Sequence, residues 1–156
     1  MDVADPVADR AACADLCDRC AAHPCSGEPV PKSLAAELRS RPGRAVLGWV
    51  ARPVAPSDGR LVLGFVTLVI VSGPPAERFS LGWLVVDPAF RHRGVGRALV
   101  ARAMHEASGL GAAEIHVETL DSWPAAVAFW QATQLAAQQA VARLQASGES
   151  RKTAEG

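Results

Sequence analysis

The stretch that decides the fold is LGWLVVDPAFRHRGVGRALV, residues 81–100. It begins with an apolar run of strand length, Leu81–Val86, and ends in an amphipathic run of helix length that continues to Ser108. Three arginines, one histidine and two glycines lie at the joint between the two runs. A helix that starts directly after a glycine loop presents unpaired backbone N–H groups and the positive end of its dipole. The sequence therefore predicts a phosphate-binding joint between a strand and a helix.

The glycine spacing excludes two common phosphate-binding motifs. Leu99 stands where the dinucleotide-binding fingerprint has its third glycine, and no Gly-Lys-Ser/Thr follows, as a P-loop would require. The pattern Arg-x-x-Gly-x-Gly at 91–96, after Val-x-Pro at 86–88, resembles the acyl-CoA pyrophosphate loop of the GNAT family of N-acetyltransferases. The alternative is an ordinary strand–turn–helix joint with a solvated basic loop.

Length and composition indicate a globular protein. The chain has 156 residues, of which 49% are hydrophobic and 21% are charged, and its net charge is zero. We expect one domain over residues 1–147 and a disordered tail over 148–156. The zero net charge argues against nucleic acid as a partner. The longest apolar run, Leu61–Val71, is too short to span a membrane, and no secretory leader is recognisable, so we expect a cytoplasmic protein without a membrane partner.

Apolar periodicity and chain breakers place the secondary structure. Helices are predicted over 11–22, 33–39, 94–108 and 125–134, and strands over 45–51, 61–71, 80–86 and 113–119. Short links predict antiparallel pairing of the first three strands, whereas the fourth follows a strand–helix crossover and should be parallel to its neighbour. On the helix over 94–108, the predicted buried side carries Val95, Leu99, Ala103, Met104 and Ala107. The fold class is α+β, layered α/β/α, with a mixed, mostly antiparallel sheet and a cysteine-rich helical N-terminus.

The resemblance to GNAT enzymes covers about residues 31–135 and implies a site. In that family, the strands that match 80–86 and 113–119 part at their ends, and acyl-CoA lies in the cleft between them. The residues that the resemblance assigns to acyl-CoA are Leu84, Val85, Val86, Arg91, His92, Arg93, Gly94, Val95, Gly96, Arg97, Ala98, Trp123 and Trp130. It implies acetyl-CoA as co-substrate, no metal ion, and direct attack on the thioester by a primary amine of a small molecule or peptide. The family's last two strands are not recognisable after residue 135, which leaves a sheet edge that a homodimer would cover.

The resemblance is weakest at the residues that move protons. The chain has no tyrosine, and Trp130 stands where the family often places a tyrosine that protonates the departing thiolate. An indole N–H donates a hydrogen bond but does not titrate in the useful range. Gly82 stands near the position of the family's strand glutamate. The candidate catalytic residues are Glu118, Ser122 and Trp130, with His116 and Asp121 nearby. A catalytically weak or inactive acyl-CoA-binding or regulatory module is the alternative.

Four cysteines gather near the N-terminus. Cys13, Cys17 and Cys20 recur on one face of the predicted helix with the spacing of the radical-SAM iron–sulfur signature, and Cys25 and His23 lie close by in the sequence. Four thiols and an imidazole are also typical zinc ligands. Against both, free cysteine is a common small core residue. We expect the thiols to pack inward, and a metal-binding domain is the third functional alternative.

Overall fold

The structure of the chain is a computed structural model that describes residues 9–22, 33–54, 61–117 and 128–132. Contacts divide the chain into two units, Met1–Glu118 and Thr119–Gly156. The first unit contains a sheet, its helices and the predicted phosphate-binding joint, and residues 128–132 of the second unit are helical. No helix within the described ranges is long and apolar enough to span a membrane. A single domain over 1–147 stays a prediction.

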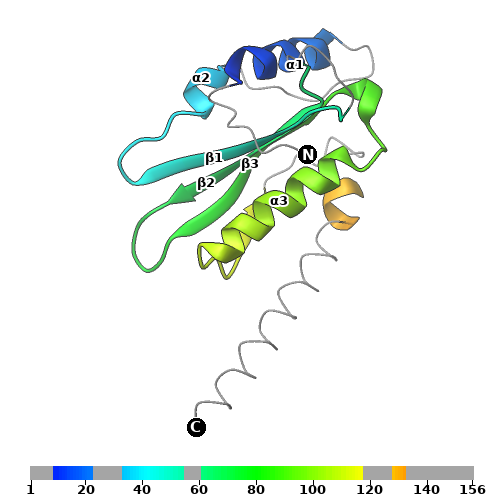
Figure 1. Cartoon of the computed structure of the whole chain (residues 1–156). Helices are drawn as coiled ribbons and strands as arrows, with labels where there is room; N and C mark the ends of the chain where they lie inside the picture. Colours follow the sequence, from blue (N-terminus) through cyan, green and yellow to red (C-terminus); the bar gives the residue numbers. More distant parts are fainter. Residues whose placement is uncertain (1–8, 23–32, 55–60, 118–127, 133–156) are drawn as a thin grey trace. The chain divides into compact units, whose positions relative to one another are not determined.

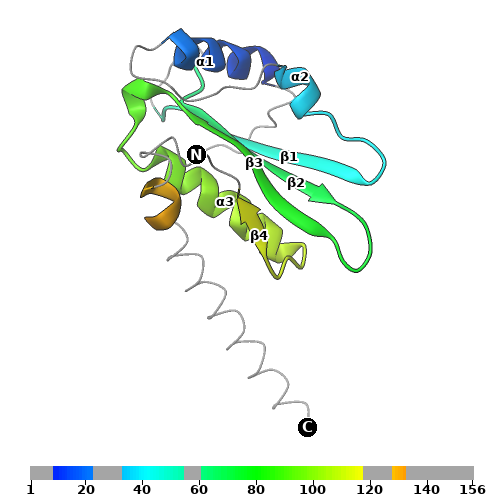
Figure 2. The same cartoon turned by 180° about the vertical axis from the view of Figure 1, so that it is seen from behind.

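A sheet with the strand order β1-β2-β3-β4 forms the centre of the first unit (Figure 1 and Figure 2). The strands are β1 (Arg44–Ala51), β2 (Gly64–Val71), β3 (Arg78–Val86) and β4 (Ile115–Val117). The first three strands pair antiparallel, and β4 pairs parallel to β3, which confirms the predicted topology. The parallel pairing follows from the helical crossover that connects β3 to β4.

Helices lie on both faces of this sheet (Figure 1). They are α1 (Arg10–Ala22), α2 (Leu34–Glu37) and α3 (Val95–Gly109), and a 3-10 turn, η1 (Pro88–Phe90), precedes α3. α1 packs on β2 and β3 from one side, and α3 packs on β1, β2 and β3 from the other. The predicted α/β/α layering is therefore confirmed. Ser33 begins α2 as predicted, because its hydroxyl accepts a hydrogen bond from the Ala36 N–H at 3.4 Å.

Each face of the sheet has its own buried side chains. Under α1 and α2, the cluster comprises Cys13, Leu16, Cys17, Cys20, Leu34, Leu38, Val50, Val62, Phe65 and Val85. On the other face, α3 buries Leu99, Val100, Ala103 and Ala107. The prediction for this helix was wrong in part, since it omitted Val100 and included Val95 and Met104, which are only half-buried. At about 100° per residue, the buried positions centre on one stripe, and Val95 and Met104 lie on its two flanks.

The strand predicted over 61–71 begins later, at Gly64. Its partner β1 ends at Ala51, and Pro53 has no N–H with which to continue the ladder. Leu63 still joins the strand ends, because its N–H donates to Ala51 O at 2.8 Å and its carbonyl accepts from the Asp87 N–H at 2.8 Å. Outside the described residues lie 118–119 of the last predicted strand, 125–127 and 133–134 of the last predicted helix, and the predicted tail, 148–156.

Candidate functional site

The predicted phosphate-binding joint begins at Asp87, the first residue after β3. Asp87 is 6% exposed, and its Oδ1 accepts a hydrogen bond from the Ala89 N–H at 2.9 Å, which starts η1. Its own N–H donates to Leu63 O and ties the end of β3 to the residues before β2. Sequence reasoning gave Asp87 no role, although an Asp-Pro pair after an apolar strand is a start signal for such a turn.

Two side chains of α1 contact the start of the joint at the end of β3. Arg19 forms an ion pair with Asp87 through Nη1 and Oδ2, and its Nη2 donates to Val62 O at 3.2 Å. Cys20 donates its thiol hydrogen to Val86 O at 3.6 Å. The start of the joint is thereby connected to α1 and to the residues before β2. Sequence reasoning missed the ion pair, because no local pattern links two residues that are 68 positions apart.

The backbone of the loop passes twice through positive φ. His92, an exposed residue, has φ 60°, and Gly94 has φ 84° and ψ 4°. The left-handed conformation is open to glycine without a steric cost, so Gly94 serves as the N-cap of α3. No side chain caps α3, and its first helical bond runs from the Ala98 N–H to Gly94 O at 3.0 Å. The three amides between Gly94 and Ala98 therefore have no acceptor within the helix.

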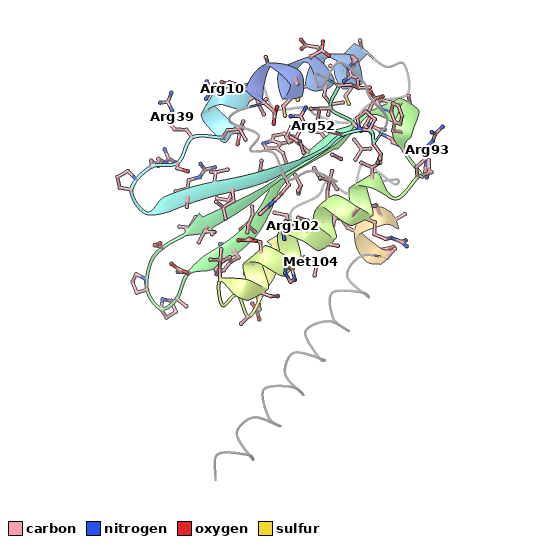
Figure 3. All side chains as sticks on the ribbon, viewed as in Figure 1. Arg10, Arg39, Arg52, Arg93, Arg102 and Met104 are labelled. Carbon is pink, nitrogen blue, oxygen red and sulfur yellow. The ribbon has the colours of Figure 1, made fainter. Side chains whose placement is uncertain are left out.

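Basic side chains surround this helix end. Arg93 and Arg97 are exposed, and the guanidinium carbon of Arg93 lies 5.5 Å from the centroid of the Phe90 ring. Figure 3 shows Arg93 on the loop at the end of the sheet, projecting outward. Arg91 is half-buried, and its Nε donates to Val86 O at 3.2 Å, which braces the loop against β3. These charges and the dipole of α3 make the helix end favourable for an anion.

β3 has a backbone edge beside the loop with which no described strand pairs. Its pairing with β4 covers Phe79–Leu81. Beyond Leu81, Val86 O accepts from the Cys20 thiol and from Arg91 Nε. The Trp83 N–H points toward β2, where it donates to Thr67 Oγ1 at 2.7 Å. Backbone groups alternate in direction along a strand, so the N–H groups of Leu84 and Val86 point to the edge away from β2. This edge is where the resemblance places acyl-CoA.

β3 also carries a β-bulge near the position of the family's strand glutamate. The register of the β2–β3 pair shifts between Val66 and Leu68, so Gly82 and Trp83 both face Thr67. A Cβ atom on Gly82 would lie 2.4 Å from Thr67 Oγ1, which is closer than real Cβ atoms approach. The bulge was not predicted, because LGWLVV is a continuous apolar run without an alternation that could reveal a change of phase.

The predicted catalytic residues are only partly described. Glu118 and Ser122 fall outside the described residues, as does Trp123 of the predicted acyl-CoA contacts. His116 lies on β4, is the register partner of Ser80, and has its Nε2 3.9 Å from Glu114 Oε2. Its side chain is exposed.

Trp130 belongs to the second unit. It lies in the helical residues 128–132 and is half-buried. Its ring packs edge-on against that of Phe129, with centroids 5.1 Å apart and an interplanar angle of 78°. The assignment of Trp130 to an acyl-CoA site stays a prediction.

The cysteines of α1 face the sheet, as predicted. Cys13, Cys17 and Cys20 are buried and belong to the same cluster as Val85 of β3. Burial disfavours the thiolate, and it raises the pKa of Cys13 from 9.0 to about 12 and that of Cys17 from 9.0 to about 11. The Asp9 carboxylate adds to the shift at Cys13. These thiols are therefore protonated at neutral pH and unreactive. Val85 contributes its side chain to the core and its backbone to the pairing with Phe65 of β2, so it offers the exposed edge of β3 neither group.

A metal site receives no support from the described part of the chain. There, no group of three or more His, Cys, Asp or Glu side chains is arranged to hold a metal ion. Metal ligation requires thiolates, which burial disfavours at Cys13 and Cys17. Cys25 and His23, the other ligands considered, lie outside the described residues.

The fold is similar to those of solved acetyltransferases. An aminoglycoside acetyltransferase from an uncultured soil metagenomic sample, in complex with trehalose, aligns with a TM-score of 0.62 and 16% identity over 81% of this chain and 80% of its own. A protein of Agrobacterium tumefaciens strain C58 that was assigned as an acetyltransferase aligns with a TM-score of 0.59 and 25% identity over 84% and 88%. An integron cassette protein of V. cholerae aligns with a TM-score of 0.49 and 21% identity over 56% and 52%. The chain thus spans about half the length of this last protein.

A family model also matches most of the chain. No curated protein gave a significant match. The model of the Acetyltransferase (GNAT) family matches residues 14–134, which is more than half of the chain. This range includes most of α1, the whole sheet and the joint from Asp87 into α3. The chain therefore belongs to the GNAT acetyltransferase family.

Proposed function

We propose that this protein is an N-acetyltransferase that transfers the acetyl group of acetyl-CoA to a primary amine of a small molecule or a peptide. The observation that carries the proposal is the N-terminus of α3, which has no side-chain cap and follows the Gly94 turn at the end of β3. Family membership supports an acyl-CoA as co-substrate. No metal ion takes part in the proposed reaction.

The joint supplies groups of the kind that acyl-CoA needs. In the proposed complex, the pyrophosphate accepts hydrogen bonds from the amides of residues 93–97, where the dipole of α3 and nearby basic side chains add positive charge. Glycine at positions 94 and 96 permits close approach of the phosphates to the backbone. The pantetheine arm lies along the backbone of Leu84–Val86, in the manner of an added strand. His92, Ala98 and Trp123 complete the proposed set of contacts.

The proposed reaction is a direct displacement. The acceptor nitrogen attacks the carbonyl carbon of the thioester, a tetrahedral intermediate forms, and the bond between that carbon and the sulfur breaks. The acceptor loses one proton and the departing thiolate gains one, so the products are an amide and free CoA. Glu118 is the first candidate for the proton acceptor and Ser122 the second, and Trp130 donates its indole N–H to the sulfur. Holding the reactants together supplies much of the rate enhancement.

Two measurements test the proposal in sequence. Calorimetry with acetyl-CoA measures binding, and thiol release is then followed over a panel of primary amines. Gly96→Glu places a negative charge at the N-terminus of α3 and should lower acetyl-CoA affinity at least about tenfold. Ser108→Glu, at the other end of the same helix, is the matched control and should leave the affinity unchanged. Wild-type protein that binds no acetyl-CoA at millimolar concentration would overturn the proposal.

One observation favours a second candidate, an acyl-CoA-binding module without turnover. Gly82 stands near the position of the glutamate that serves many family members as a base, a Cβ atom there would lie 2.4 Å from Thr67 Oγ1, and the chain has no tyrosine. Acetyl-CoA binding without thiol release to any amine would favour this module. Homodimerisation and cytoplasmic localisation stay predictions.

A further inference from the structure

We propose that Thr67 of β2 is a positioning residue for the acyl-CoA site, because its hydroxyl holds β3 in the bulged form that orients the backbone of Leu84 and Val86. The inference rests on the proposed function, which assigns that backbone to the pantetheine arm. Thr67 acts through β3 and makes no contact with the co-substrate.

Thr67 is the polar residue of the apolar strand GFVTLVIV and is 2% exposed. A buried hydroxyl is costly unless it is hydrogen-bonded. Its Oγ1 accepts a hydrogen bond from the Trp83 N–H at 2.7 Å, which is a short distance for an N–H donor. The side chain of Thr67 thus satisfies a backbone donor that the main chain of a regular β2 would satisfy.

The bulge explains why a side chain, and not the main chain of β2, accepts the hydrogen bond from the Trp83 N–H. β2 and β3 pair regularly up to Val66 and again from Leu68, while Gly82 and Trp83 both face Thr67. An extra residue in one strand leaves a ladder group without its main-chain partner. Thr67 is 2% exposed, so loss of its hydroxyl would leave the Trp83 N–H facing an apolar side chain in place of an acceptor.

The backbone at residue 82 lies directly against this hydroxyl. A Cβ atom there would be 2.4 Å from Thr67 Oγ1 and 3.2 Å from Val69 Cγ2. A larger residue at position 82 would therefore displace the Thr67 hydroxyl from the Trp83 N–H. A carboxylate base at this position would displace the same hydroxyl, so the proposed reaction takes its proton acceptor from another element.

The bulge also decides which face and edge the following residues use. Before it, Leu81 is the register partner of Leu68, and after it, Val85 is the register partner of Phe65. Residues 65 and 68 lie on opposite faces of β2, so the odd-numbered residues of β3 change from the α3 face to the α1 face. The same change of phase sends the N–H of Leu84 to the edge away from β2. The Thr67 hydroxyl therefore sets the orientation of the groups assigned to the pantetheine arm.

Binding of CoA and of ADP to the full chain separates the two parts of the site, because ADP carries the pyrophosphate but lacks the pantetheine arm. Thr67→Val keeps the shape of the side chain and removes the acceptor. We expect its CoA affinity to fall about tenfold and its ADP affinity to stay within about twofold, both measured by calorimetry. Thr67→Ser keeps the hydroxyl and should keep its CoA affinity within about threefold of wild type. Ala107→Gly, in the last turn of α3, lowers stability without touching the site and should change neither affinity.

Each result supports or overturns the inference. It is overturned by a Thr67→Val variant that binds CoA as well as wild type, by equal losses for CoA and ADP, or by a Thr67→Ser variant as weak as Thr67→Val. If Thr67→Val does not fold, Thr67→Cys, whose thiol is a weak acceptor, takes its place with the same expected selective loss. Wild-type protein that binds no CoA would instead overturn the proposed function, so the two failures are distinguishable.

Discussion

Replacing Arg19 by alanine tests whether the joint is held in place from α1. The change removes the ion pair with Asp87 and the hydrogen bond from Nη2 to Val62 O at 3.2 Å. The Asp87 side chain is 9% exposed, and it retains the hydrogen bond from the Ala89 N–H. Leaving one partner of a fully buried pair uncompensated costs about 3–5 kcal/mol. The Arg19 side chain is 35% exposed, so water replaces part of its contact, and we expect a loss of about 2–3 kcal/mol.

Urea denaturation measures this loss as a change in the free energy of unfolding. Asp15→Ala is the matched control, because it removes the other carboxylate that Arg19 contacts, at 3.3 Å, and the Asp15 side chain is 72% exposed. An exposed pair of this kind contributes less than about 1 kcal/mol. The double variant Arg19→Ala/Asp87→Asn completes a cycle, and the two changes should couple by more than about 1 kcal/mol.

Two results would refute this reasoning. Losses for Arg19→Ala and Asp15→Ala that agree within about 0.5 kcal/mol would show that the ion pair with Asp87 adds nothing beyond a surface contact. Arg19→Ala should also bind acetyl-CoA more weakly than Asp15→Ala, because Asp87 starts the turn into the loop. Full affinity in a destabilised Arg19→Ala variant would show that the loop keeps its shape without α1.

Three further perturbations have expected outcomes. Gly64→Ala should lower the free energy of unfolding by about 1–3 kcal/mol in urea, because its Cβ would lie 2.9 Å from Val85 O, and an unchanged midpoint would contradict this packing. Alkaline pH should destabilise the protein, because the Cys13 and Cys17 thiols ionise near pH 9.0 when unfolded but have pKa values of about 12 and about 11 when folded. The contribution of the two protonated thiols to the stability of the protein is complete below pH 9.0. Above that pH it is lost by up to about 1.4 kcal/mol per pH unit for each thiol. A melting temperature that is flat from about pH 8 to pH 11 would refute this expectation. Gly94→Ala should lower the free energy of unfolding by about 1 kcal/mol, and its φ of 84° is the sole cause because a Cβ there meets nothing within 4 Å. In calorimetry, Gly94→Ala should weaken CoA binding more than Gly94→Asn does. The reverse order would contradict a left-handed cap.

The joint was predictable from sequence because every signal for it is local. An apolar run, a glycine turn and a helical period follow one another within 81–108. The topology also followed from local rules, since short links pair strands antiparallel and a helical crossover makes the next strand parallel. The first limit appears on α3, where the buried stripe includes Val100 and has Met104 on its flank. Small and large apolar residues occur on several sides of α3 itself, so the helical period alone did not identify the centre of the buried stripe.

The remaining features of the site depend on residues that are distant in sequence. Arg19 and Asp87 meet because α1 packs on the sheet, and neither residue belongs to a motif that predicts the other. Thr67 was visible as a polar residue in an apolar strand, but its partner could not be named without the register of β2 against β3. The bulge is invisible in the sequence because it lies in the apolar run Leu81–Val86, where a change of phase leaves the pattern unaltered.

Thr67 and Arg19 act on opposite ends of one short stretch, residues 82–87. Thr67 holds its beginning through the Trp83 N–H, and Arg19 holds its end through the Asp87 carboxylate. The backbone proposed to meet the pantetheine arm lies between these two anchors, and neither anchor is part of the loop motif. Loss of the Thr67 hydroxyl should therefore misalign the arm and leave pyrophosphate recognition in place, whereas loss of the Arg19 ion pair should also disturb the turn that leads into the loop. In the proposed complex, alignment of the thioester thus depends on β2 and α1 as well as on the loop motif.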